Sequence, residues 1–222
     1  MKDNFIHVCF VVDESGSMYD SVKDVVGGFK QIIDEQKRVK EGRCAVSLYT
    51  FADSVKEIFV GKDVNDVDTI VYHPHGCTAM NDGIGTAIDN IGKWLDNMPE
   101  DEKPSKNLIV IMTDGEENSS REYSLERVKE MIKHQQDVYS WSFMFLGADI
   151  TNLNDAQNLG LRMSSVTTKA NMYKNYDMIN TATSLYRMSE ARCAAVTMDS
   201  YMDMESKKLS DEYEKETGNK LS

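Results

Sequence analysis

Three short polar clusters in this 222-residue chain combine carboxylate side chains with hydroxyl side chains. They lie at residues 13–17 (Asp-Glu-Ser-Gly-Ser), at residues 76–82 and at residues 113–118. None of them offers a pair of His or Cys residues at the spacing of a zinc site. Oxygen atoms are the ligands that a small, hard divalent ion such as Mg²⁺ prefers. The clusters therefore indicate an all-oxygen metal site, although Asp and Ser after a strand are also ordinary helix caps.

Strands and helices that alternate along the chain must position these clusters. Nearly continuous apolar runs predict buried strands, and apolar residues that recur at helical spacing predict amphipathic helices. The predicted strands cover residues 5–12, 44–51, 56–60, 107–112, 138–146 and 163–167. The predicted helices cover residues 22–40, 80–98, 125–132, 152–159 and 169–198.

This order predicts an α/β fold with three layers, a Rossmann-like, doubly wound and mostly parallel six-stranded sheet covered by helices on both faces. The strand at 56–60 closes a hairpin with 44–51 and is expected to be the one antiparallel edge strand. We expect one domain over residues 1–198 and a charged tail, flexible or helical, over residues 199–222. Ligands of such sheets bind outside the carboxyl ends of the strands, where the three clusters are predicted to lie.

The composition argues against several classes of partner and location. The chain has 25 Lys and Arg against 37 Asp and Glu, a formal net charge of −12, and this balance argues against nucleic-acid or anionic-membrane partners. No apolar run approaches the roughly 18 residues of a membrane span, and the N-terminus lacks a signal-peptide pattern. Four cysteines show no paired spacing, and Cys9 and Cys44 lie at apolar runs, which suits buried free thiols. We therefore expect a cytoplasmic protein.

The clusters resemble the metal-ion-dependent adhesion site of the von Willebrand factor type A domain family. Asp13-x-Ser15-x-Ser17, then Thr78 in the second cluster, then Asp114 in a Thr-Asp-Gly sequence match the positions of that motif. The resemblance covers roughly residues 5–190, and the chain further resembles small stand-alone bacterial or phage members of the family.

The resemblance implies a role for each of the five motif residues. Ser15, Ser17 and Thr78 would ligate Mg²⁺ or Mn²⁺ through their hydroxyl oxygens, while Asp13 and Asp114 would hold metal-bound waters and supply charge. The remaining coordination position would take an Asp or Glu carboxylate from a partner protein. The resemblance therefore implies a metal-dependent protein-binding module and not an enzyme.

Two alternatives remain open at this point. A Mg²⁺-dependent hydrolase of the phosphatase kind is one, because an Asp at the end of a first strand also begins phosphatase and receiver sites. Those sites usually have a second carboxylate in the same loop, whereas residues 15 and 17 are Ser. The chain also contains neither a Gly-x-Ser-x-Gly elbow nor a phosphate-binding loop. The other alternative is a purely structural interaction domain with a vestigial site.

Smaller predictions concern residues outside the motif. Glu14 is expected to point to solvent, and residues 116–118 (Glu-Glu-Asn) are expected to form a solvated loop. His73 and His75, beside Cys77, are a minor zinc candidate that lacks a fourth ligand. Methionines late in the chain are expected to pack the last helix against the sheet, namely Met172, Met178, Met188, Met198, Met202 and Met204.

Overall fold

The computed structural model describes residues 2–40, 42–147, 156, 158–161, 164–166 and 183–184. Within them one sheet contains six strands in the order β3-β2-β1-β4-β5-β6. The strands are β1 (Lys2–Asp13), β2 (Arg43–Phe51), β3 (Val55–Asp63), β4 (Pro104–Thr113), β5 (Ser142–Gly147) and β6 (Ser164–Val166). The helices are α1 (Val22–Arg38), α2 (Met80–Asp96) and α3 (Leu125–Tyr139), with short 3₁₀ helices η1 (Gly16–Ser21), η2 (Val64–Asp66) and η3 (Glu100–Glu102).

The pairing of the strands confirms the predicted topology. β1 lies at the centre of the sheet and pairs in parallel with both β2 and β4, and β5 and β6 continue the parallel order beyond β4. β3 pairs antiparallel with β2 and forms one edge. Along the chain, β2 and β3 follow β1 and lie on one side of it, and β4 then pairs with β1 on the other side. The strand order therefore reverses between β1 and β4, the position at which sheets of this class bind ligands.

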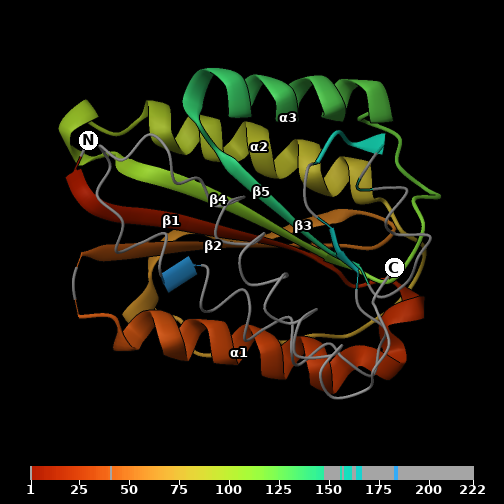
Figure 1. Ribbon diagram of the computed structural model, residues 1–222. Coiled ribbons are helices and arrows are strands. Elements are labelled where there is room, and N and C mark those ends of the chain that lie inside the picture. The colour runs from red at the N-terminus through yellow and green to blue at the C-terminus, as the bar shows by residue number, and fades with distance from the viewer. Residues whose placement is uncertain are drawn as a thin grey trace, which may run out of the picture.

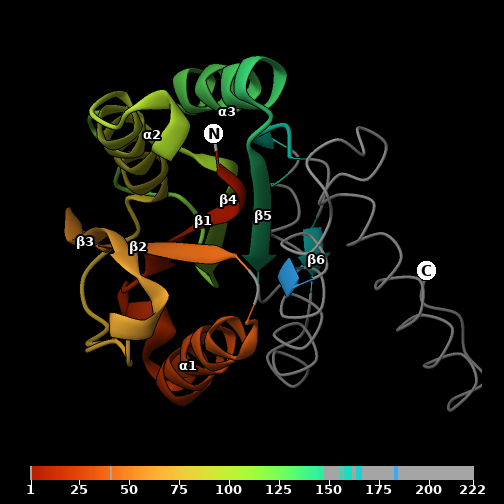
Figure 2. The same ribbon diagram turned by 90° about the vertical axis from the view of Figure 1, so that its left-hand side faces the viewer.

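Helices cover both faces of the sheet, as Figures 1 and 2 show, with α1 on one face and α2 and α3 on the other. Alternate residues of β1 divide between the two cores because successive side chains of a strand point to opposite faces. Phe10 packs in the core that contains Phe29 of α1, while Val11 packs in the core that contains Ile84 of α2. This double burial explains why the central strands are nearly continuous apolar runs.

One predicted boundary is wrong. The strand predicted at 138–146 begins only at Ser142, because α3 continues through Val138 to Tyr139. The helix ends where Ser140 adopts a left-handed conformation with φ of 55°, and the Ser140 N–H donates to the Gln135 carbonyl. The other described strands lie within three residues of their predictions, as do α1 and α2, whereas α3 continues seven residues beyond its predicted end at Ile132.

Several predictions fall largely outside the described residues. Of the helix predicted at 152–159, only residues 156 and 158 are described as helical. The helix predicted at 169–198 is described only at residues 183 and 184, and its methionines, Cys193 and the tail at 199–222 lie outside the described part.

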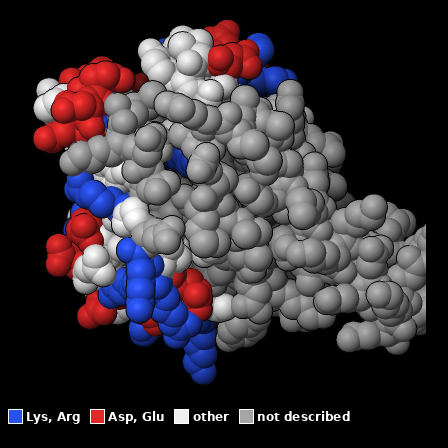
Figure 3. All heavy atoms as spheres, turned by 60° about the vertical axis from the view of Figure 1, so that its left-hand side comes forward, with Lys and Arg blue, Asp and Glu red and all other residues white. Residues whose placement is uncertain are grey.

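Cys9 and Cys44 are buried and belong to no disulfide, as predicted, whereas the Cys77 thiol is exposed. Basic and acidic side chains lie interspersed on the face shown in Figure 3. None of the described helices combines the length and the apolar character that crossing a membrane requires.

Candidate metal centre

The carboxyl ends of β1 and β4 bring two of the motif aspartates to the same edge of the sheet. Asp13 is the last residue of β1, and Asp114 follows the last residue of β4. The Asp13 side chain is fully buried. Its Oδ1 accepts the backbone N–H of Ser15 at 2.7 Å, and its Oδ2 accepts the Thr113 hydroxyl at 2.6 Å. These two hydrogen bonds fix the orientation of the carboxylate.

The two serines of the motif connect Asp13 to Asp114. The Oγ atoms of Ser15 and Ser17 lie 3.0 Å apart, and the Ser17 hydroxyl donates to Oδ1 of Asp114 at 2.8 Å. Ser21, at the end of η1, donates to the other oxygen of Asp114 at 3.4 Å. The 3₁₀ helix η1 therefore carries the hydroxyl groups that contact the aspartate from the neighbouring strand.

Gly115 shows where the oxygens of three motif residues meet. A Cβ atom placed on this glycine would lie 3.0 Å from Oγ1 of Thr78, 3.1 Å from Oγ of Ser17 and 3.4 Å from Oδ2 of Asp13. Two hydroxyls and a carboxylate from the first and second clusters thus surround one small space that a side chain at residue 115, in the third cluster, would enter. Hydroxyl and carboxylate oxygens match the preference of a small, hard divalent cation, so the residues present fit the predicted metal.

The electrostatics of the centre also favour a cation. Burial raises the pKa of Asp13, and the negative charge of Asp114 adds to that rise, although hydrogen bonds from Thr113 and Ser15 oppose it. Two carboxylates near one point repel each other when both are ionised. A divalent ion held at this centre would offset that repulsion and would favour the charged form of Asp13.

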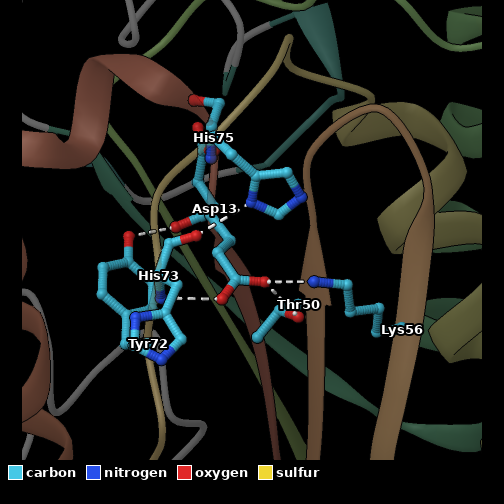
Figure 4. A network of polar contacts seen from close by, with 8 residues as sticks. Asp13, Thr50, Lys56, Tyr72, His73 and His75 are labelled. Atoms are coloured by element: carbon cyan, nitrogen blue, oxygen red, sulfur yellow. Dashed lines mark hydrogen bonds and ion pairs between the residues drawn. The ribbon is translucent and has the colours of Figure 1, made fainter.

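The prediction that Glu14 points to solvent is wrong. Glu14 is buried, and its Oε2 accepts the Thr50 hydroxyl and the Lys56 ammonium, each at 3.1 Å. Its Oε1 accepts the backbone N–H of His73 at 2.9 Å. Figure 4 labels the three partners of this carboxylate, Thr50, Lys56 and His73. Burial alone would raise the pKa of Glu14, but the bonds from His73, Lys56 and Thr50 outweigh burial and lower it. Glu14 therefore joins β1 to β2, to β3 and to the segment that leads to Thr78.

Backbone hydrogen bonds complete this connection. The Tyr72 hydroxyl donates to the Asp13 carbonyl, and the His75 N–H donates to the Glu14 carbonyl at 2.8 Å. The Gly16 N–H donates to the Gly76 carbonyl at 3.1 Å, so residues 72–76 lie directly against the first cluster.

The zinc candidate gains no support from the geometry. The carbonyl of His73 lies 2.8 Å from Nδ1 of the His75 ring, which places this nitrogen as a donor. Among the described residues, no group of three or more His, Cys, Asp or Glu side chains is placed to hold a metal ion. The centre at Asp13 and Asp114 is not such a group, because hydroxyl side chains supply its other oxygens.

The loop predicted at 116–118 is only partly a solvated loop. Glu116 and Asn118 are exposed, but Oδ1 of Asn118 accepts the Thr78 N–H at 3.0 Å. Oε2 of Glu117 accepts the Asn81 N–H at 2.8 Å. Sequence reasoning missed both contacts. One signal was available, because the residue before the predicted helix at 80–98 is Ala79, which cannot cap it.

Solved structures with the same fold share little sequence with this chain. Proximal thread matrix protein 1 from the mussel byssus, solved with a zinc-occupied MIDAS motif, is 19% identical with a TM-score of 0.57, over 82% of this chain and 46% of that one. The vWF domain of the pili tip protein Mfa5 from Porphyromonas gingivalis is 10% identical, with a TM-score of 0.61. The match covers 85% of this chain and 98% of the Mfa5 domain. The PilB minor pilin of Streptococcus sanguinis is 16% identical, with a TM-score of 0.56. The match covers 83% of this chain and 62% of the pilin.

These likenesses show a shared fold, and this chain spans about half the length of the mussel protein. No curated protein matches the chain. The family model of the von Willebrand factor type A domain, however, matches residues 7–191, which is most of the sequence. The chain belongs to the von Willebrand factor type A domain family.

Proposed function

We propose that this chain is a metal-dependent protein-binding module. Mg²⁺ or Mn²⁺ would be held at the centre between β1 and β4, and the partner would present an Asp or Glu carboxylate to it. The observation that carries this proposal is the convergence of Thr78, Ser17 and Asp13 oxygens on the space in front of Gly115. The metal-occupied motif of the mussel protein supports an ion at this place in the fold.

Each motif residue has a distinct part in this proposal. The hydroxyls of Ser15, Ser17 and Thr78 would contact the ion, and Asp13 and Asp114 would provide two negative charges that balance it. Because most of the ligands are neutral, the ion keeps affinity for a further carboxylate. Acidic residues outnumber basic ones in the chain, so an acidic partner would depend on the ion for its attraction.

The hydrolase alternative receives less support from the geometry. Both carboxylate oxygens of Asp13 accept hydrogen bonds from within the protein. The hydroxyls of Ser15 and Ser17 contact each other and Asp114, not a His that could act as a general base. Metal-dependent hydrolysis of an aryl phosphate, abolished by Asp13→Ala, would favour the alternative.

We also propose a cytoplasmic location. The buried thiols of Cys9 and Cys44, which belong to no disulfide, support it.

Calorimetric titration of Mg²⁺, Mn²⁺ and Zn²⁺ into chelator-stripped protein tests the metal site. We expect saturable one-site binding in the wild type and its loss in Asp114→Asn, which removes a charge at the centre. Asp20→Asn is the matched control, because Asp20 is an exposed acidic residue of η1. Binding that Asp114→Asn and Asp20→Asn retain equally would contradict the proposal.

The partner is tested with the same proteins immobilised as baits. We expect the wild type to retain a protein in Mg²⁺ that EDTA releases, and we expect Asp114→Asn to retain none. Changing Asp and Glu residues of the captured protein to Asn and Gln should then identify one carboxylate on which binding depends. A partner that binds equally well in EDTA would count against metal-dependent recognition.

A further inference from the structure

The helix α2 begins without a capping side chain of its own. Its N-cap residue is Ala79, which makes no side-chain hydrogen bond, so the first N–H groups of the helix need other acceptors. The β4–α3 loop (residues 114–124) supplies them. Oε2 of Glu117 accepts the Asn81 N–H at 2.8 Å, and Oγ of Ser120 accepts the Asp82 N–H at 3.0 Å. A negative charge at this end of a helix is also favoured by the helix dipole.

The same Glu117 carboxylate shapes the loop that carries it. Its Oε1 accepts the N–H groups of Ser119 at 3.0 Å and of Ser120 at 2.8 Å. Its Oε2 also accepts the Ser120 hydroxyl at 2.8 Å. Loss of this carboxylate would therefore leave donors unpaired in both the β4–α3 loop and α2.

Thr78 lies between these two elements and is held by the loop through its backbone. The Thr78 N–H donates to Oδ1 of Asn118 at 3.0 Å. The Thr78 carbonyl accepts the N–H groups of Asn118 at 3.1 Å and of Ser119 at 3.2 Å. Both polar groups of the Thr78 backbone are thus bonded to the loop that begins with Asp114.

We propose that Glu117 is a positioning residue that holds the Thr78 hydroxyl at the metal centre. By capping α2 and folding its own loop, Glu117 joins the segments that carry Thr78 and Asp114 into one unit. Glu117 does this without contributing an oxygen to the space in front of Gly115. The inference rests on the proposed metal site for its consequence. The hydrogen bonds of Glu117 with Asn81, Ser119 and Ser120, here called the clamp, involve none of the five motif residues.

Hydrogen exchange of the metal-free, full-length chain tests the clamp. Glu117→Gln keeps the side-chain shape but loses the charge and one acceptor oxygen. We expect the amides of residues 80–82 and 118–120 to exchange about tenfold faster in this variant, the size expected for a lost charged hydrogen bond. Glu116→Gln is the matched control, because Glu116 is the adjacent, exposed residue and loses the same charge. Equal exchange in the two variants would overturn the clamp.

Mn²⁺ affinity measured in a double-mutant cycle tests the consequence for Thr78. We expect Glu117→Gln to weaken Mn²⁺ binding about tenfold, as changes in residues that orient metal ligands do. Glu116→Gln should change the affinity by a few-fold at most, because an exposed charge is screened. In a Thr78→Ala background, Glu117→Gln should cause no further loss. Losses that multiply in the double variant would show that Glu117 does not act through Thr78.

These measurements separate the inference from the proposed function. If the wild type binds no Mn²⁺ but Glu117→Gln speeds exchange, the clamp stands and the proposed function fails. If the wild type binds Mn²⁺ and the exchange of the two variants is equal, the proposed function stands and the clamp fails. Ser120→Ala, which removes the acceptor of the Asp82 N–H and the hydroxyl that donates to Glu117, replaces Glu117→Gln in both tests if the latter does not fold.

Discussion

Gly115 is the single residue that should report most directly on the space available to an ion. In Gly115→Ala the new methyl group would lie 3.0 Å from the Thr78 hydroxyl and 3.1 Å from the Ser17 hydroxyl. We expect Mn²⁺ affinity to fall about tenfold or more, because the methyl group occupies the space that the oxygens surround. Calorimetric titration of Mn²⁺ into the wild type and into Gly115→Ala measures this loss of affinity.

The fold of this variant should be retained, because Gly115 is not among the glycines with positive φ, which are Gly42, Gly61, Gly76 and Gly160. Gly27→Ala is the control, since a Cβ on this exposed residue of α1 meets no atom within 4 Å. Unchanged Mn²⁺ affinity in Gly115→Ala would mean that the ion does not bind in front of this residue.

Single residues also show where sequence reasoning reaches its limit. The motif positions could be recognised because type and spacing identify them without any knowledge of contacts. Glu14 lies between two of these residues, yet its partners Thr50, Lys56 and His73 come from three other segments. A buried carboxylate that is satisfied only by distant residues looks like a surface residue in the sequence.

Glycines within the helices offer a prediction at the scale of elements. A Cβ atom placed on Gly27 of α1 or on Gly92 of α2 would meet no other atom within 4 Å, so alanine fits at both positions. We expect each Gly→Ala change to stabilise the protein by roughly 0.5–1 kcal/mol, because alanine loses less backbone entropy in a helix. Urea unfolding measures the free energy of each variant.

Gly85 of α2 is the contrasting position in that series. A Cβ there would lie 2.4 Å from the Tyr123 ring, so α2 packs against the β4–α3 loop through the absence of a side chain. We expect Gly85→Ala to destabilise the protein by about 1–3 kcal/mol, since packed rings resist such overlap. Equal increases in the free energy of unfolding at all three glycines would show that α2 and the β4–α3 loop are not closely packed.

The elements themselves were largely predictable, and their ends were not. Strands buried on both faces and helices with one apolar face leave clear patterns, and the sheet follows from their order. The boundary between α3 and β5 was wrong because Val138 and Tyr139 are apolar but lie exposed in the last turn of the helix. Ser140 ends α3 in a left-handed conformation that sequences usually mark with glycine.

At the scale of the whole molecule, the described residues combine two apolar cores with a buried polar cluster of His7, Ser47 and Asn107 in the sheet. His7 of β1 is fully buried and lies 2.7 Å from the Ser47 hydroxyl through Nε2 and 3.2 Å from Oδ1 of Asn107 through Nδ1. Its ring centroid lies 4.8 Å from that of Trp94. Since Oδ1 of Asn107 can only accept, Nδ1 carries the proton and Nε2 accepts from Ser47. The neutral ring is therefore the form that joins β1 to β2 and β4.

This cluster should make the stability of the whole molecule depend on pH. Burial lowers the pKa of His7 to about 4, whereas an unfolded His titrates near 6.5. Stabilisation by the neutral ring is fully present above the unfolded value. It is lost as pH falls from about 6.5 to about 4, because only the unfolded chain takes up the proton, and the loss is roughly 3 kcal/mol.

Free energies of urea unfolding, determined across this pH range, measure the loss. His7→Gln should remove the part of the slope of unfolding free energy against pH that His7 causes. His134→Gln changes an exposed histidine and should leave the slope intact. An unchanged slope in His7→Gln would show that His7 does not control the pH dependence.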